Sequence, residues 1–199
     1  MQKRKSGKFD KVFSAAASAI FLCAVVLTGA AGPAGGQSTG APQQTGTPPT
    51  GDIQKVAACP YCGMDRQKFA HSRVYIEYDN GSHLGTCSIH CAAVDMAVHI
   101  DKAPQKIWVG DYNSKELIDA EKAVWIIGGD QMGVMTKRAK WAFGDPAAAD
   151  QFMKAHGGKV AGFEEAVEGA YEDMYQDTKL IRERRAKKRM MKMQQQGAK

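Results

Sequence analysis

Four cysteines form two short motifs whose spacing suits the binding of one metal ion. The first motif runs from Cys59 to Cys62 and is followed by Gly63, and the second runs from Cys87 to Cys91. Two cysteines separated by two residues on a tight turn direct both sulfurs to the same side, and glycine lets the backbone turn back with positive φ. Cysteines four residues apart share one face of a helix. The four thiols together therefore predict a metal site.

Methionine and histidine residues near these motifs indicate which metal the site would prefer. Met64 follows Cys62 by two residues, His90 lies inside the second motif, and Met135 lies in a glycine-rich loop. Thiolate and thioether ligands select Cu(I), whereas four thiolates alone suit Zn(II) equally well, and imidazole suits both. His90 is therefore either a ligand or a bystander. The candidate ligands for Cu(I), with Zn(II) as the alternative, are Cys59, Cys62, Met64, Cys87, His90, Cys91 and Met135.

Two other interpretations of the cysteines remain open from the sequence. In an exported protein, four cysteines can form two disulfides. Cys-Pro-Tyr-Cys is also the active-site string of glutaredoxins, which need the first cysteine at the start of a helix that follows a buried strand. No β-rich run precedes Cys59, and Gly63 stands where such a helix should continue. Thiol–disulfide exchange is thus the less favoured prediction, and no other catalytic constellation stands out.

The segments that must position the cysteines begin with a unit at about residues 59–120. Asp79-Asn80-Gly81 is a strong hairpin turn between two β-rich runs. Apolar residues then recur with a helical period after Ser88, which can cap the helix. The predicted strands of this unit are residues 74–78, 83–86 and 106–109, with a possible short one at 117–118.

A second unit, at about residues 121–168, repeats the order strand–strand–helix–strand. Its helix is predicted to begin after Asp145, with Pro146 at the first helical position, and to end at Gly157-Gly158. Its predicted strands are residues 123–127, 139–143 and 159–163. The predicted fold class is therefore α+β, with two consecutive units, each a small sheet covered by one helix.

The two ends of the chain are basic, and the part between them is mildly acidic. The net charge of +6 comes from residues 1–11 and 171–199, which leaves −3 for the middle. This distribution does not favour nucleic-acid binding by the domain itself. The helical spacing and the excess of Lys and Arg in residues 169–199 predict a basic helical tail. This tail is either solvated or in contact with anionic lipid or an acidic partner.

The N-terminal residues have the order of an export signal. In residues 1–30, a basic stretch precedes an apolar run and a group of small residues. The apolar run is short for a membrane span, so a cleaved signal is the first prediction and an N-terminal anchor the alternative. Residues 31–52, rich in Ala, Gly, Pro, Gln, Ser and Thr, predict a flexible linker.

Short segments spread over residues 59 to about 165 carry a family resemblance. They are Cys62-Gly63-Met64, Trp108-Val109-Gly110-Asp111-Tyr112, Ile118-Asp119-Ala120, Val124-Trp125-Ile126-Ile127-Gly128-Gly129, Gly133-Val134-Met135, Ala142-Phe143 and His156-Gly157-Gly158-Lys159-Val160. In these segments and their order, the chain resembles the NosL family of copper-binding accessory proteins for nitrous oxide reductase. The first unit also resembles small heavy-metal-binding knuckles with Cys-x-x-Cys-Gly-Met followed by Cys-Ser-x-x-Cys, although Gly85-Thr86 stand where those knuckles usually carry aromatic residues.

The resemblance to the NosL family implies a specific function, which the residue types and their spacing alone do not indicate. It implies a two-unit α+β domain over residues 53–168 in an exported, periplasmic and often lipid-anchored protein that is not an enzyme. It further implies Cu(I) held by Cys62, Met64 and Met135, and a partner that is either a copper donor or a client cuproenzyme such as nitrous oxide reductase. The alternative function is a structural zinc- or disulfide-stabilised interaction module.

Overall fold

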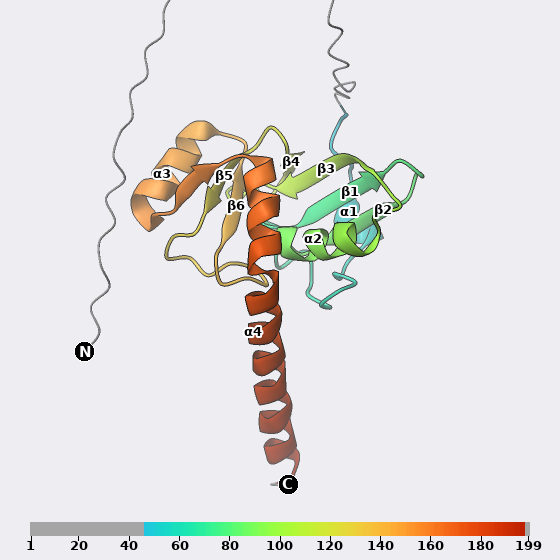
Figure 1. Cartoon of the computed structure of the whole chain (residues 1–199), viewed down its shortest axis with the longest axis vertical. Helices are drawn as coiled ribbons and strands as arrows, with labels where there is room; N and C mark the ends of the chain where they lie inside the picture. The colour runs from blue at the N-terminus through green and yellow to red at the C-terminus, as the bar shows by residue number, and fades with distance from the viewer. Residues whose placement is uncertain (1–45, 198–199) are drawn as a thin grey trace, which may run out of the picture. The chain divides into compact units, whose positions relative to one another are not determined.

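The structure, a computed structural model, describes residues 46–197. In this part of the chain there are two antiparallel sheets, and a helix packs on each of them (Figure 1). The first sheet has the strand order β2-β1-β3-β4 and carries α2 against β1 and β2. Its elements are β1 (Val74–Tyr78), β2 (His83–Thr86), α2 (Ile89–Val98), β3 (Pro104–Gly110) and β4 (Leu117–Asp119). A short helix, α1 (Asp52–Lys55), precedes them.

The second sheet has the strand order β6-β5-β7 and is covered by α3. Its elements are β5 (Val124–Ile127), β6 (Lys140–Phe143), α3 (Pro146–His156) and β7 (Lys159–Ala161). A long helix, α4 (Phe163–Gly197), follows and packs against α2 and β5. The predicted α+β class with two successive units is confirmed. The expected boundary between domain and tail, at residue 168, lies inside α4.

The hairpin of the first sheet sets the position of the second cysteine motif. Gly81 turns the chain with a φ of 77°, and the Asn80 side-chain oxygen accepts a hydrogen bond from the Ser82 amide (2.9 Å). The resulting register pairs Val74 with Thr86. Because side chains alternate between the faces of a strand, this register fixes which face the residues after β2 occupy.

Two hydrophobic clusters place the cysteines between the units. One joins both sheets, with Ile76 of β1, Trp125 of β5 and Ala166 of α4 among its buried members. The other contains three of the cysteines together with aromatic residues of the second unit, including Trp141 and Phe143. The first unit therefore supplies the thiols, and the second unit supplies the apolar surface that shields them from water.

The start of α3 follows the sequence prediction and gives a simple test of the fold. The Asp145 carboxylate accepts a hydrogen bond from the Ala147 amide (2.9 Å), and Pro146 occupies the first helical position. Asp145→Ala is expected to lower the free energy of unfolding by about 1 kcal/mol, because one amide at the helix N-terminus loses its acceptor. Urea unfolding followed by circular dichroism measures the loss. The exposed Asp150, on the same helix, provides the control Asp150→Ala; an equal loss in both variants would contradict a capping role.

The predicted export signal, residues 1–30, and most of the predicted linker lie outside the described residues. Among residues 46–197, none of the helices combines the length and the apolar character needed to cross a bilayer.

Candidate metal centre

The loop of the first cysteine motif reverses the chain directly after Cys62. The Cys59 amide donates a hydrogen bond to the Met64 carbonyl (2.9 Å), and the Gly63 amide donates to the Cys59 carbonyl (2.8 Å). Gly63 has a φ of 73°, a left-handed conformation that glycine adopts without steric cost. The predicted knuckle is therefore present.

The same geometry argues against a glutaredoxin-like site. The chain makes a turn after Cys62 and enters no helix there; the next helix in the described residues is α2, which begins at Ile89. Within residues 46–197, no strand precedes Cys59, since β1 begins only at Val74. The helix N-terminus that would depress the pKa of the first cysteine in such an enzyme is thus absent from this part of the chain.

The second cysteine motif lies where β2 ends and α2 begins. Cys87 follows β2 directly, and its carbonyl accepts a hydrogen bond from the Ser72 hydroxyl (2.9 Å). Cys91 lies in the first turn of α2, on the face shared with Cys87. Ser88 precedes α2 as predicted, but its hydroxyl makes no capping hydrogen bond and lies 3.9 Å from the Cys87 sulfur. The expected cap at Ser88 is wrong, because the hydroxyl is directed at the thiol.

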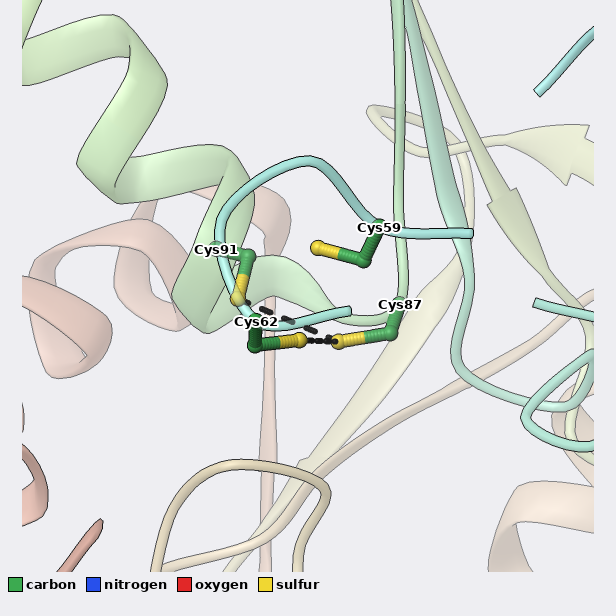
Figure 2. A group of neighbouring side chains, drawn as sticks. All are labelled: Cys59, Cys62, Cys87 and Cys91. Carbon is green, nitrogen blue, oxygen red and sulfur yellow. Dashed lines mark hydrogen bonds between the residues drawn. The ribbon is translucent and has the colours of Figure 1, made fainter. Parts of the chain in front are cut away.

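The four sulfurs of the two motifs converge (Figure 2). All four Sγ atoms lie within 4.8 Å of one another; Cys62 and Cys87 are 3.3 Å apart, and Cys87 and Cys91 are 3.8 Å apart. Sulfurs around a tetrahedral ion with bonds of about 2.3 Å lie roughly 3.8 Å apart. All four cysteines are free thiols, and only Cys62 is not fully buried. The cluster is therefore close to the size that encloses a single soft metal ion.

Hydrogen bonds among the four thiols shift their pKa values in opposite directions. Hydrogen bonds with Cys62, then with Cys87 and Cys91, lower the pKa of Cys59. Hydrogen bonds with Cys59 and Cys62 raise the pKa of Cys87, and the same bonds together with one from Cys87 raise the pKa of Cys91. Burial raises both further. A cation at the centre would favour the thiolate form of each sulfur that coordinates it.

Cys62 also lines an open pocket of about 470 Å³ that is rich in thioethers. Met64 of the first motif and Met135 of the second unit lie in its wall, together with Met132. Met135 has a φ of 63°, and a left-handed conformation at a non-glycine residue costs roughly 1–3 kcal/mol and tends to occur at functional sites. Three predicted ligands from two segments that are distant in the sequence, Cys62 and Met64 in one and Met135 in the other, thus share one pocket.

Two further parts of the pocket wall were not indicated as site residues by the sequence. His71 lines the pocket, with its ring centroid 5.5 Å from that of Trp141, and burial lowers the pKa of His71, which favours the neutral imidazole that metals bind. Helix α4 contributes Arg185, which donates a hydrogen bond to the Cys62 carbonyl (3.0 Å). No local pattern could have linked Arg185 to a motif 123 residues away.

His90 lies beside the thiols and faces α4. It lines a smaller cavity of about 190 Å³ with Cys62, Cys91 and Met135. Its Nδ1 lies 3.5 Å from Asp177 Oδ2, and neither buried atom has a hydrogen-bond partner among the described residues. Burial lowers the pKa of His90. The structure therefore places this residue next to the candidate centre, and its role as a ligand stays a prediction.

A carboxylate of α2 fixes the loop of the first motif. The Tyr61 hydroxyl donates to one oxygen of Asp95, and the Tyr78 hydroxyl of β1 donates to the other. Asp95 is buried; the hydrogen bond from Tyr78 is fully shielded from water and the one from Tyr61 partly so, and shielding strengthens a hydrogen bond. Because Tyr61 lies between the two cysteines of the first motif, this contact ties that motif to the helix that carries Cys91.

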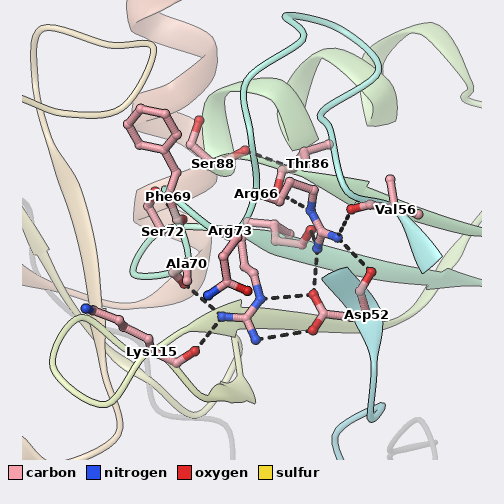
Figure 3. A network of polar contacts seen from close by, with 12 residues as sticks. Asp52, Val56, Arg66, Phe69, Ala70, Ser72, Arg73, Thr86, Ser88 and Lys115 are labelled. Atoms are coloured by element: carbon pink, nitrogen blue, oxygen red, sulfur yellow. Dashed lines mark hydrogen bonds and ion pairs between the residues drawn. The ribbon is translucent and has the colours of Figure 1, made fainter. Parts of the chain in front are cut away.

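A buried ion network joins the segments that flank the two motifs (Figure 3). Arg66 is completely buried; it donates to the Asp52 carboxylate (2.8 Å) and to the Thr86 carbonyl (3.1 Å). Arg73 donates to the same carboxylate (2.9 Å). Arg66 follows the first motif and Thr86 precedes the second, so the network holds them at a fixed separation. Asp52, predicted to end the flexible linker, is instead 4% exposed and at the centre of this network.

Comparisons with known proteins found a family and a solved structure that are similar to this chain. A family model described as NosL matches residues 49–170. Among solved structures, the crystal structure of the copper chaperone NosL from Shewanella denitrificans is similar, with 19% sequence identity and a TM-score of 0.48, over 60% of this chain and 96% of that chain. No curated protein sequence matches the chain.

Proposed function

The chain belongs to the NosL family, whose model spans more than half of its 199 residues, and on this premise we propose that it binds Cu(I) as cargo and passes it to another protein. It is not an enzyme in this proposal. The cargo would be held by Cys62, Met64 and Met135, while the other thiols and His90 are further candidate donors whose participation the pH dependence below measures. Soft thiolate and thioether sulfurs are the donors that Cu(I) prefers.

One observation carries this proposal: Cys62 belongs both to the four-thiol cluster and to the methionine-lined pocket. Its sulfur lies 3.3 Å from that of Cys87, and its side chain lines the same pocket as Met64 and Met135. A purely structural zinc site would need only the four thiols, and a thioether beside them would have no role in it. A cluster with one sulfur facing an open, thioether-lined pocket suits an ion that must enter and leave.

Transfer would proceed by exchange of ligands at the open side. Thioethers bind Cu(I) without losing a proton, so Met64 and Met135 can hold or release it with no change in charge. Cys62, the least buried of the four thiols, is the sulfur that an incoming ligand from a partner can reach. The family resemblance favours a client cuproenzyme such as nitrous oxide reductase, in an exported, periplasmic setting, with a copper-donor protein as the upstream partner.

The proposal is tested by an anaerobic Cu(I) titration of the reduced chain against a chromophoric competitor, with free thiols counted in parallel. Saturation at one or a few Cu(I) per chain, with the thiols reduced at the start, is the expected result. If the chain cannot compete for Cu(I) and all four thiols are oxidised after anaerobic isolation, the cysteines are structural disulfides and the proposal fails.

The pH dependence of the affinity reports which sulfurs bind. Every protonated thiol that becomes a ligand releases a proton, so affinity rises with pH by about one logarithmic unit per pH unit for each such thiol. The pKa values of Cys87 and Cys91 are raised, so both are protonated at neutral pH. A slope of at most one between about pH 6 and 8 is expected for Cys62 with two methionines. A slope of two or more would mean that Cys87 or Cys91 also coordinates the ion.

The size of the thiol cluster favours one alternative, a structural zinc module that acts in protein interaction. Three of its four sulfurs are buried, as in closed zinc sites. The test is the metal content of anaerobically purified protein. One tightly bound Zn(II) that an equal concentration of Cu(I) does not displace would support the zinc module over copper transfer.

A further inference from the structure

Helix α4 continues well beyond the domain on which it packs. Its first part buries Ala166 and Ala170 against the core, but every described side chain from Lys187 to residue 196 is exposed. The family model also ends at residue 170, so most of this helix is outside the region shared with the family. Isolated helical segments shorter than about 12–15 residues are marginal in water. The end of α4 is therefore a segment that a partner would stabilise.

The charges of α4 are divided sharply between its two halves. Residues 163–178 contain six acidic residues and no lysine or arginine. Residues 179–193 contain eight basic residues and one acidic residue, Glu183. Two such helices repel when parallel, because like halves meet. When antiparallel, each acidic half lies against the basic half of its partner, so the sequence favours one orientation of a second α4.

A row of exposed tyrosine and methionine side chains, with one half-buried alanine between them, runs along one face of α4. Its members are separated by four, eleven, four and three residues, intervals that return to the same side of a helix. They are Tyr171, Tyr175, Ala186, Met190 and Met193. Tyr175 is 73% exposed and Met193 is 70% exposed, so the row, which we call the α4 seam, has no cover in the described part of the chain.

The seam lies opposite the face with which α4 contacts its own domain. At 3.6 residues per turn, the buried Ala166, Ala170 and Asp177 lie roughly half a turn away from Tyr171 and Tyr175. A second helix can therefore lie along the seam without displacing the domain.

An acidic-rimmed groove at the start of the seam fits the end of the same helix. The groove has a volume of about 590 Å³ and an apolar lining that includes Met96, Phe163 and Val167. Glu164 and Glu168 lie at it and form no salt bridge within residues 46–197. The other end of the seam complements this groove in charge and in apolar character. It has two methionines, flanked by the basic residues Lys188, Arg189 and Lys192.

We propose that two copies of this chain pair antiparallel along the α4 seam, with the basic, methionine-containing end of each helix in the acidic-rimmed groove of the other. The distance from groove to helix end is the same in both copies, so both contacts form at once and the pair closes as a twofold dimer. Ile181 and Arg185 line the thioether-rich pocket beside Cys62 and lie on a different side of α4 from Tyr175 and Met193. Dimerisation therefore leaves this pocket accessible in each copy.

Sedimentation velocity of the full chain in reducing buffer tests this dimer. A dimer is expected at about 50 mM salt that dissociates at about 0.5 M, because the contact is largely electrostatic. The variant Lys188→Glu/Arg189→Glu/Lys192→Glu and the variant Glu164→Lys/Glu168→Lys should each be monomeric, with association weakened at least tenfold. Mixed together, these two variants should form a heterodimer, because the reversed charges again complement each other.

Matched controls separate this interface from general charge effects and from copper binding. Lys55→Glu/Lys154→Glu reverses two exposed lysines away from α4 and should leave the dimer intact. Cu(I) affinity should be unchanged in all variants, so loss of the dimer and loss of copper binding are distinguishable. A wild-type monomer at all salt concentrations would overturn the proposal. A wild-type monomer that pellets with anionic vesicles through the basic residues would also overturn it and assign this helix end to a membrane surface.

Discussion

Cys62→Ser is expected to weaken Cu(I) binding by more than about a hundredfold, since changes outside the ligand shell already cost about 10–100-fold. Cys62 is the one sulfur common to the thiol cluster and the thioether pocket. Serine keeps the size of the side chain but lacks the soft donor that Cu(I) prefers. Because Cys62 is only half-buried, the fold should be retained. Competition titration measures the affinity, and far-UV circular dichroism checks the fold.

Methionine variants separate loss of a ligand from loss of packing. Met64→Leu and Met135→Leu keep apolar volume and remove the thioether, so both should weaken Cu(I) binding with little change in stability. Met153→Leu is the matched control, because Met153 packs on the same core cluster but does not line the pocket. Tight stoichiometric binding by the Cys62→Ser variant, or equal losses in all three leucine variants, would contradict the assigned ligands.

Asp52→Ala is expected to destabilise the fold by about 3–5 kcal/mol, the cost of removing one partner from a buried ion network. The Asp52 carboxylate accepts hydrogen bonds from Arg66 (2.8 Å) and from Arg73 (2.9 and 3.2 Å). Without it, the two buried guanidinium groups have no acidic partner among residues 46–197. Urea unfolding followed by tryptophan fluorescence measures the loss of stability.

A surface aspartate controls for the general effect of removing a carboxylate. Asp101 is exposed and forms no salt bridge in the described part of the chain, so Asp101→Ala should change stability by less than about 0.5 kcal/mol. Asp52→Ala should also weaken Cu(I) binding, because Arg66 ties the first cysteine motif to the strand that leads to Cys87. A stability loss below about 1 kcal/mol would show that the network is not essential to the fold.

The support of the metal centre depends on polar groups held away from water. Arg66 and Asp95 are both buried, and each joins the segment carrying the first motif to a neighbouring element, a strand or α2. Buried networks of this kind confer a fixed geometry when every group is satisfied. The Nδ1 of His90 and the Oδ2 of Asp177 are among the few buried side-chain atoms of residues 46–197 that have no hydrogen-bond partner. These two atoms lie where α4 meets the site.

The sequence by itself determined the local elements of this protein. The hairpin turn at Gly81, the cap at Asp145 and the reversal at Gly63 each depend on the conformational preference of one or two residues, so the pattern alone predicts them. The spacing of the cysteines likewise predicted that each pair shares one side of its own segment. The incorrect cap at Ser88 is instructive, because its hydroxyl is directed at a sulfur, and no local preference reports such a neighbour.

Only the tertiary structure decided which distant residues meet. Met135 shares a pocket with Cys62 because the second unit packs on the first, and Arg185 reaches the Cys62 carbonyl because α4 crosses α2. Asp52 looked like the end of a polar linker, since nothing near it in sequence indicates two arginine partners. Spacing along the chain specifies which groups share a turn, whereas contacts between units depend on packing, which a single sequence does not display.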